Sequence, residues 1–252
     1  MAVADDGILA PGAVALVTGA SAGFGVAITE ALVAKGCRVI AAARRLDRLR
    51  ALAERLGPNC HPLTLDVTDA AATENLIERL PEDLRAIDIL VNNAGHDTGG
   101  RRRFDQGDMA QWASIVETNV TGLMRVTSAV TPGMVERDRG HIVNLGSISG
   151  FKPYAGGTVY AASKFAVHGF TASLRADYVG TGIRVTEILP GTARTEFGDT
   201  RWQGDKAQAS AFYDGYETLL DAEDIARCVV FALEQPAHVV ISELVVMPTS
   251  QW

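Results

Sequence analysis

The chain has 252 residues, and its 23 Lys and Arg against 30 Asp and Glu give a net charge of −7 at pH 7. With 47% hydrophobic and 21% charged residues it can bury a sizeable core, which excludes a disordered or fibrous protein. The acidic balance argues against nucleic acid as a partner, and no apolar run approaches the roughly 20 residues of a membrane span. Residues 1–6 are acidic where a signal peptide would be basic. The three cysteines, Cys37, Cys60 and Cys228, are far apart, as is typical of a reducing compartment, so we expect a cytoplasmic globular protein.

Short β-rich apolar runs alternate with longer stretches of helical period along the chain. The predicted strands cover residues 13–18, 38–42, 63–65, 87–91, 141–145, 183–188 and 239–247. The predicted helices cover residues 23–35, 46–56, 70–80, 109–136, 158–179 and 222–233. This alternation requires right-handed crossovers onto a parallel sheet, and strands that are apolar at nearly every position fit a sheet covered on both faces. The sequence therefore predicts an α/β fold, a doubly wound, Rossmann-like sheet in a single domain over residues 1–252, with an irregular substrate lid at about 191–213.

A glycine-rich turn, Thr18-Gly19-Ala20-Ser21-Ala22-Gly23-Phe24-Gly25, directly follows the first predicted strand. Such glycines let the backbone turn tightly and approach a pyrophosphate, whose charge sits at the N-terminus of the next helix. A turn of this kind without any ligand would look similar. The second strand ends in Arg44 and Arg45, where an acidic residue would favour NAD and arginine accommodates the 2′-phosphate of NADP. The alternative is a solvated pair of cations, which would oppose the helix dipole unless an anion sits there.

Three side chains predict proton transfer at a hydroxyl or carbonyl group. Tyr160 and Lys164 are one helical turn apart, so the lysine cation can lower the tyrosine pKa, which is ordinarily near 10 and too high for a base. Ser147 follows the fifth strand, where it would polarise the substrate oxygen. The alternatives are a Tyr/Lys packing pair and a simple capping serine.

The motifs Asn92-Asn93-Ala94-Gly95, Ser147 and Tyr160-Ala161-Ala162-Ser163-Lys164 follow the glycine turn in that order. Together they resemble the short-chain dehydrogenases/reductases over about residues 13–250. Within that family the chain is similar to the NADP-dependent 3-hydroxy acid dehydrogenases, which oxidise serine and allo-threonine. This closer likeness is carried by residues 22–25, 132–137, 153–157, 236–238 and 247–248.

The resemblance implies which residues bind the cofactor NADP: Gly19, Ser21, Gly23, Phe24, Gly25, Arg44, Arg45, Asp66, Val67, Asn93, Ala94, Gly95, Tyr160, Lys164, Pro190, Gly191, Thr192 and Thr195. It places Asp66 at the adenine, although a turn residue at a strand end would look the same. It assigns the nicotinamide carboxamide to the backbone near Thr192 and the hydroxyl of Thr195. Asn92 would support the cofactor side of the sheet or form a structural hydrogen bond.

The resemblance also implies that Asn119 completes the catalytic set by holding a water that relays protons to Lys164. A local hydrogen bond that kinks the helix can coexist with that role. Relatives form tetramers through the two long helices, here about 109–136 and 158–179, so the resemblance implies a homotetramer.

Substrate contacts are expected from Ser149, Tyr154 and Arg201. Arg201 would grip a substrate carboxylate or, alternatively, form an ion pair between lid and body. The loop at 96–103 carries more charge than we expect there. It could form an anion site at the mouth of the cleft or be a solvated loop. The five histidines show no metal-binding spacing, so no metal is expected.

The sequence thus predicts an NADP-dependent oxidoreductase that interconverts a small polar alcohol of the β-hydroxy acid type with its carbonyl. The alternatives are a broader ketone or amino-alcohol dehydrogenase and, in a different class, a non-catalytic NADP-binding sensor. A sensor usually loses the tyrosine or the lysine, and both are present. The partner is therefore a small molecule, with neither nucleic acid nor a membrane involved.

Overall fold

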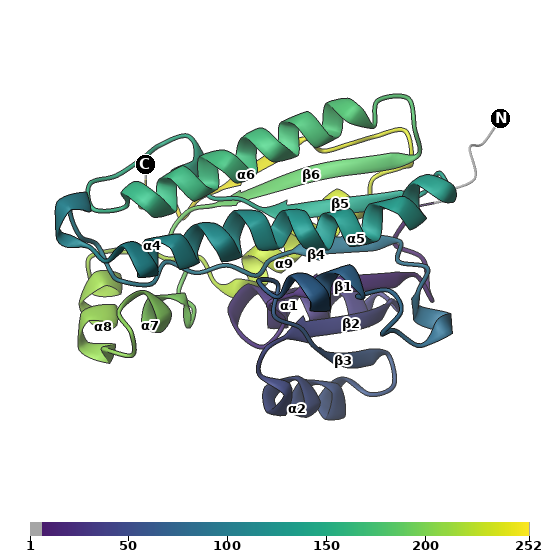
Figure 1. Cartoon of the computed structure of the whole chain (residues 1–252), viewed down its shortest axis with the longest axis horizontal. Helices are drawn as coiled ribbons and strands as arrows, with labels where there is room; N and C mark the ends of the chain where they lie inside the picture. Colours follow the sequence, from purple (N-terminus) through teal and green to yellow (C-terminus); the bar gives the residue numbers. More distant parts are fainter. Residues whose placement is uncertain (1–6, 252) are drawn as a thin grey trace.

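The computed structural model describes residues 7–251, so the expectation about a signal peptide at residues 1–6 lies outside the described residues. Its sheet has seven parallel strands in the order β3-β2-β1-β4-β5-β6-β7 (Figure 1). This order reverses direction between β1 and β4, which confirms the predicted doubly wound, Rossmann-like sheet. The strands are β1 (Val14–Thr18), β2 (Arg38–Ala43), β3 (Cys60–Thr64), β4 (Ile89–Asn92), β5 (Gly140–Leu145), β6 (Ile183–Pro190) and β7 (Glu243–Val246).

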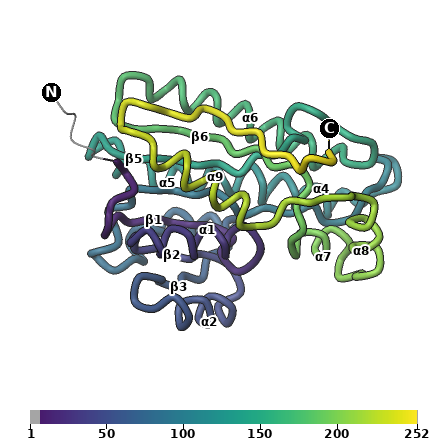
Figure 2. The backbone as a smooth tube through the Cα atoms, turned by 180° about the vertical axis from the view of Figure 1, so that it is seen from behind, coloured from purple at the N-terminus to yellow at the C-terminus, as the bar shows by residue number. Residues whose placement is uncertain are grey.

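Helices cover both faces of the sheet. Figure 1 shows α4 (Met109–Val116), α5 (Leu123–Glu136) and α6 (Thr158–Asp177) across one face, the face that α3 (Ala70–Glu74) also joins through its contacts with α5. Figure 2 shows the other face, where α1 (Gly23–Ala34) packs against α9 (Ala222–Leu233). The helix α2 (Leu46–Leu56) packs into the same core as α1 and α9.

The central strands are buried at every position because successive side chains enter two different cores. In β1, Ala15 and Val17 pack toward α1 and α9, whereas Val14 and Leu16 pack toward α5. This is why β1 is apolar throughout instead of alternating with polar residues.

Both edge strands differ from the prediction. β3 begins at Cys60, three residues before the predicted start, and Pro62 lies inside it; an edge strand tolerates a proline because it has one side free of ladder hydrogen bonds. β7 covers only Glu243–Val246 of the predicted 239–247, since Val239 instead donates its N–H to the Pro236 carbonyl in a turn.

Three predicted helices also differ. The helix at 70–80 ends at Glu74, where the side chain of Asn75 donates to the Ala71 carbonyl and competes with the helical pattern. The predicted helix 109–136 is divided by a π-helical segment, η3 (Glu117–Gly122). The helix predicted to reach residue 179 ends at Asp177.

The segment predicted to be an irregular lid contains two helices, α7 (Phe197–Arg201) and α8 (Lys206–Asp214). The side chain of Asp205 accepts hydrogen bonds from the N–H groups of Ala207 and Gln208 and so begins α8 as an N-cap. Figures 1 and 2 show α7 and α8 together at one end of the sheet. The remaining elements are the short 3-10 turns η1 (Glu82–Leu84), η2 (Phe104–Gln106) and η4 (Ile148–Gly150). Among residues 7–251, no helix has the length and apolar character needed to cross a bilayer.

Candidate active site

A cavity of about 590 Å³ extends from the glycine-rich turn to the lid. It lies at the carboxyl ends of the strands, where ligands bind in open parallel sheets. Of the predicted site residues, only Gly25 and Asn119 do not line it. The residues that do are Gly19, Ser21, Gly23, Phe24, Arg44, Arg45, Asp66, Val67, Asn93, Ala94, Gly95, Ser147, Ser149, Tyr154, Tyr160, Lys164, Pro190, Gly191, Thr192, Thr195 and Arg201.

The glycine-rich turn is packed too closely for side chains. Gly19 has a φ of +68°, and a Cβ atom there would lie 2.8 Å from the Asn93 side chain. A Cβ atom on Gly25 would lie 2.3 Å from the carbonyl oxygen of Gly19. Gly25 therefore lets the turn pack on the first turn of α1, which explains why it does not face the cavity.

Arg45 and Arg48 connect the glycine-rich turn to the lid through Glu196. Arg45 donates from Nε to the Ser21 hydroxyl at 3.0 Å, and its Nη1 lies 3.3 Å from the Glu196 carboxylate. Arg48 Nη1 contacts the same carboxylate at 2.7 Å. Burial raises the pKa of Glu196, but Arg48 and Arg45 outweigh this and hold it below its ordinary value. Arg44 forms no ion pair with any other residue in 7–251, and its charge acts on Asp66.

Asp66 lines the cavity and also organises the turn that follows it. Its Oδ1 accepts hydrogen bonds from the N–H of Thr68 at 3.0 Å and from the Thr68 hydroxyl at 2.8 Å. Burial raises the pKa of Asp66, but these bonds and the charge of Arg44 lower it further than burial raises it. The two interpretations of Asp66, adenine contact and turn residue, are therefore compatible. Asn92 is buried and bonds to Thr127 and Asn144, each at 2.9 Å.

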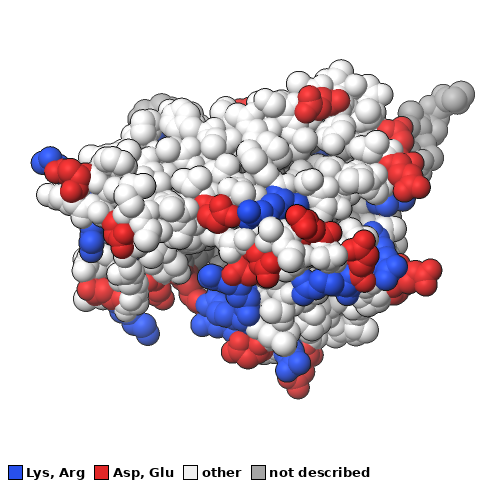
Figure 3. Space-filling view, in the orientation of Figure 1, with Lys and Arg blue, Asp and Glu red and all other residues white. Residues whose placement is uncertain are grey.

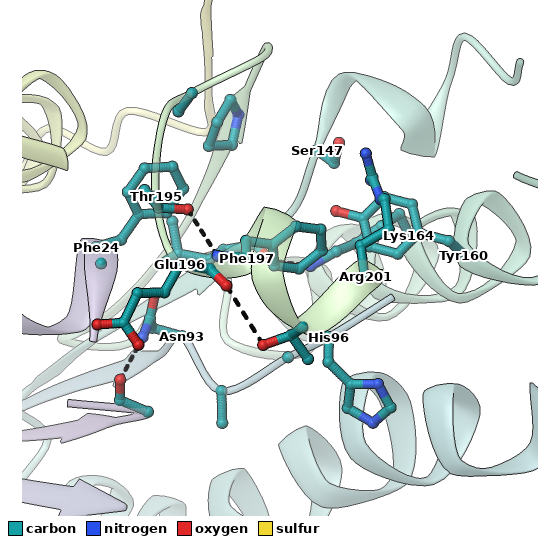
Figure 4. Close-up of a pocket in the computed structure, with 18 of the residues that line it drawn as sticks. Phe24, Asn93, His96, Ser147, Tyr160, Lys164, Thr195, Glu196, Phe197 and Arg201 are labelled. Atoms are coloured by element: carbon teal, nitrogen blue, oxygen red, sulfur yellow. Dashed lines mark hydrogen bonds between the residues drawn. The ribbon is translucent and has the colours of Figure 1, made fainter. Parts of the chain in front are cut away.

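Tyr160, Lys164 and Ser147 meet at the inner end of the cavity (Figure 4). Burial raises the pKa of the Tyr160 phenol above its ordinary value, while Arg201 and a hydrogen bond with Ser147 act in the opposite direction. Ser147 also accepts a hydrogen bond from the N–H of Ser149 at 3.1 Å, so it begins the η4 turn as well. Ser147 therefore lines the cavity and also caps the η4 turn, so the two interpretations of this serine are compatible.

Lys164 is buried and has a carboxylate in its surroundings that the sequence analysis did not find. Its Nζ donates to the Leu145 carbonyl at 2.8 Å. Burial lowers the pKa of Lys164 to about 8, and Glu187 on β6 opposes that change. Glu187 is itself fully buried, and its Oε2 lies 2.8 Å from Nδ1 of His168 on α6. The available sequence signal was an acidic residue inside a predicted strand, next to the apolar residues Ile188 and Leu189.

Asn119 lies in the π-helical segment η3, behind the cavity wall. Its Oδ1 accepts from the N–H of His96 at 2.9 Å, and its Nδ2 donates to the His96 carbonyl at 3.0 Å and to the Ser163 hydroxyl at 3.1 Å. It thus ties the loop after β4 to α6, the helix that carries Tyr160. π-Helical turns of this kind are frequent at functional sites.

The backbone after β6 is already hydrogen-bonded at the position expected to hold the carboxamide. The N–H of Thr192 donates to Oε1 of Gln251 at 2.7 Å, and the Thr195 hydroxyl accepts from the N–H of Phe197 at 3.2 Å. Gln251 comes from a distant part of the chain and was not predicted.

Arg201 lines the cavity and forms the ion pair that was its alternative interpretation. Its Nε lies 2.8 Å from Oδ2 of Asp97, and both side chains are buried. The Tyr154 hydroxyl lies 3.5 Å from both Asp97 Oδ2 and Arg201 Nη2. Phe197, the residue after Glu196, packs edge to face against Tyr160 with ring centres 5.7 Å apart. In Figure 4, Arg201 lies beside Tyr160 and Lys164.

The family model for short chain dehydrogenases matches residues 13–206. The chain belongs to the short-chain dehydrogenase family. It is 45% identical over 239 residues to the NADP-dependent 3-hydroxy acid dehydrogenase YdfG of Salmonella typhimurium, covering 94% of this chain and 96% of that protein. It is 44% identical over 241 residues to sulfoacetaldehyde reductase 2 of Chromohalobacter salexigens, covering 94% and 95%. Among solved structures, the closed form of serine dehydrogenase complexed with NADP+ matches with a TM-score of 0.92 and 44% identity, covering 95% of this chain and 96% of that one.

As a short-chain dehydrogenase, the chain is an oxidoreductase that acts on CH–OH groups, which confirms the predicted enzyme class. The lining residues that sequence analysis missed include Glu196, Phe197, Phe212 and Gln251. Asp97 belongs to the charged loop at 96–103, but its ion pair with Arg201 was not predicted. Part of the charged loop at 96–103 turns inward: Arg101 stacks over Tyr154 and Phe212, 4.5 and 4.7 Å from the ring centres. Within residues 7–251, no group of three or more His, Cys, Asp or Glu side chains could hold a metal ion.

Proposed function

We propose that this short-chain dehydrogenase uses NADP(H) to interconvert a small polar alcohol of the β-hydroxy acid type with its carbonyl. The observation that carries the proposal is a single cavity in which Tyr160, Lys164 and Ser147 lie beside Arg201. A hydroxyl group held at Tyr160 would have the guanidinium of Arg201 within reach of an acid group a few atoms away. The names of the relatives support a small acidic or zwitterionic substrate.

In this proposal Tyr160 exchanges the proton with the substrate oxygen, as acid in reduction and as base in oxidation. Lys164 stabilises the phenolate, and Ser147 polarises the substrate oxygen by hydrogen bonding. Asn119 is a positioning residue that holds the His96 loop and α6 together and supports the proton path to Lys164. Bound NADP supplies or accepts the hydride.

The residues at the other end of the cavity fit a dinucleotide that carries a 2′-phosphate. A Cβ atom at Gly19 would clash with Asn93 and Ala94, and a Cβ atom at Gly23 would lie 3.2 Å from Thr195 of the lid, so the turn keeps its close approach only with glycines. Arg44 lines the cavity at the end of β2 without an ion pair to another residue in 7–251, so its guanidinium is available to a phosphate. Arg45, held by Ser21 and Glu196, is the second candidate.

The experiment is a steady-state panel with the purified protein. NADP(H) and NAD(H) are each combined with β-hydroxy acids, amino alcohols and uncharged ketones. The proposal expects the highest kcat/KM with NADP(H) and a β-hydroxy acid or its carbonyl. A preference for uncharged ketones would favour the broader dehydrogenase, and NADP binding without any turnover would favour the sensor.

The proposal extends to assembly, organisation and location. The helices α4, α5 and α6 carry exposed apolar residues, namely Met109, Val116, Met124, Val135 and Phe165. Figure 3 shows few charges over α6 on this face. These apolar residues suit a homotetramer paired through these helices, which light scattering would test.

We also propose a single domain over residues 1–252 with the lid at about 191–213. The three free cysteines suit a cytoplasmic location, which cell fractionation would test.

A further inference from the structure

The buried ion pair between Asp97 and Arg201 borders the cavity. Asp97 is 4% exposed and Arg201 7% exposed, and only Arg201 lines the cavity. A substrate in the cavity therefore meets the guanidinium of Arg201 first, with the carboxylate of Asp97 behind it.

The guanidinium is held in place from several sides. Asp97 accepts from its Nε at 2.8 Å, and the Tyr154 hydroxyl lies 3.5 Å from its Nη2. The ring centres of Phe197 and Phe212 lie 5.2 and 5.3 Å from its central carbon. Of the five N–H donors of an arginine, those of Nη1 and one of Nη2 are left for a ligand. Arg201 can thus contact a substrate without leaving Asp97.

Within the pair, one carboxylate compensates one guanidinium, and Arg101 adds a second cation nearby. A substrate carboxylate bound at Arg201 would place two carboxylates on one buried cation, and like charges in one site disfavour each other. Burial already raises the pKa of Asp97, although Arg201 and Arg101 lower it. A second carboxylate would favour a proton on Asp97 still more.

We propose that Asp97 is a specificity residue of the substrate site: it compensates the charge of Arg201 and so weakens the binding of singly anionic hydroxy acids relative to uncharged or zwitterionic ones. The proposal rests on the proposed function for the place of the substrate, beside Tyr160. When a hydroxy acid does bind, Asp97 takes up a proton from solvent, which leaves one carboxylate, that of the substrate, on the cation.

The test uses two substrates of nearly the same size and shape, the anion 3-hydroxybutyrate and the uncharged 3-hydroxybutyramide. In Asp97→Asn the side chain keeps its size and a hydrogen-bond acceptor but loses its charge. The KM for the acid should fall by about tenfold, because the substrate carboxylate no longer shares the cation with a second carboxylate, while the KM for the amide stays within about twofold. Asp199→Asn removes a carboxylate from the same lid helix, with no ion pair to Arg201, and should leave both KM values unchanged.

A second measurement needs no variant. In the wild-type protein the ratio of the KM for the acid to that for the amide should rise with pH as Asp97 loses its proton. The groups that face Asp97 are Arg201, Arg101 and Tyr154, and Tyr160 also senses its charge. The ratio is compared above about pH 6, where a carboxylic acid with an ordinary pKa of about 4 stays ionised. Titration of Tyr160 or Lys164 changes the reaction of both substrates, so the change of the ratio in this range reports the charge beside the substrate carboxylate.

Two results would overturn the proposal. One is a KM for the acid that rises in Asp97→Asn, or that changes equally for acid and amide, because Asp97 would then only hold the lid in place. The other is a wild-type ratio that is independent of pH, which is decisive even if the variant does not fold. If the enzyme turns over neither compound, the substrate class of the proposed function fails separately. The same two compounds are then tested as inhibitors of the reduction of a carbonyl compound that the enzyme does accept. Equal inhibition by both compounds at every pH would contradict the role of Asp97.

Discussion

The two ends of the cavity are built by different means. At the glycine-rich turn, backbone geometry sets the shape, because Gly19 and Gly25 bring main chain to within contact of main chain and of Asn93. At the lid, side chains set the shape, through the pair of Asp97 with Arg201 and the rings packed around it. The end at the glycine-rich turn, where we propose the cofactor binds, therefore follows from a short local motif, whereas the end at the lid, where we propose the substrate binds, depends on which distant loops meet.

Tyr160→Phe should change catalysis without changing cofactor binding, and it should have the largest effect on turnover. The hydroxyl that exchanges the proton is lost, so kcat should fall by about 10²- to 10⁴-fold. The cofactor end is untouched, so the Kd for NADPH, measured by fluorescence titration, should stay within about twofold of the wild type, since no charged hydrogen bond to the cofactor is removed. Tyr178→Phe, at the end of the same helix, is the matched control and should keep full activity. Normal turnover in Tyr160→Phe would contradict the assigned role.

Arg44→Asp tests the one charged side chain on which the cofactor end is expected to depend. Replacing a cation by an anion should lower kcat/KM for NADP by about one to two decades and leave that for NAD level or higher. The two cofactors must be compared at one ionic strength, because salt screens the interaction. Arg45→Asp is the comparison variant, with a smaller loss because Glu196 already pairs with Arg45. An unchanged ratio of NADP to NAD in Arg44→Asp would refute the prediction.

Glu187→Gln tests the pH dependence of Lys164, which lies between the two ends of the cavity. The pKa of Lys164 is lowered by burial to about 8, and the Glu187 carboxylate opposes that lowering. Without the carboxylate the pKa falls further, so Lys164 loses its proton at lower pH. The alkaline limb of NADPH-driven reduction should then move down by about one pH unit.

The control for Glu187→Gln is Glu243→Gln, in the neighbouring strand at the position opposite Glu187. That carboxylate is exposed and should leave the limb where it is. If both variants gave the same profile, Glu187 would have only a structural role.

Glu196→Gln weakens the connection between the two ends and should have the smallest effect. Its ion pairs with Arg45 and Arg48 are about half exposed, and such pairs contribute about 0–1 kcal/mol each. NADPH should dissociate about two- to fivefold faster at low salt in stopped-flow measurements, and the difference should vanish near 1 M salt. Asp199→Asn, also in the lid, should dissociate NADPH at the wild-type rate. A difference that persists at high salt would mean that Glu196 acts by something other than charge.

Much of the fold could be predicted from the sequence because the central strands and their helices carry continuous local signals. The run Val14–Thr18 is apolar on both faces, and only a doubly covered sheet accommodates that. The edge strands were less predictable, since β3 contains Pro62 and β7 is short. The π-helical turn at Asn119 left no periodic signal, because one additional residue per turn is absorbed within a long helix.

The candidate site divides in the same way. Residues that follow strand ends, such as Ser147 and Thr192, were placed at the cavity because parallel strands end at one edge. The partner of Thr192, Gln251, and the partner of Arg201, Asp97, were not predicted, because they come from segments whose paths no periodicity encodes. Arg201 was identified with two interpretations open, and only the position of Asp97 could decide that an ion pair forms.

The buried pair of Asp97 and Arg201 also has a consequence for how the lid responds to heat. Arg201 is the last residue of α7 in the lid, and Asp97 follows β4 in the body, so a lid that opens must pull the two charges apart and hydrate both. Hydration of ions carries a strongly negative entropy and becomes less favourable as temperature rises. Warming, which loosens most surface segments, therefore opposes the separation of these two charges. The helix α7 is thus held to the body of the protein by an ion pair whose separation becomes more costly as the temperature rises.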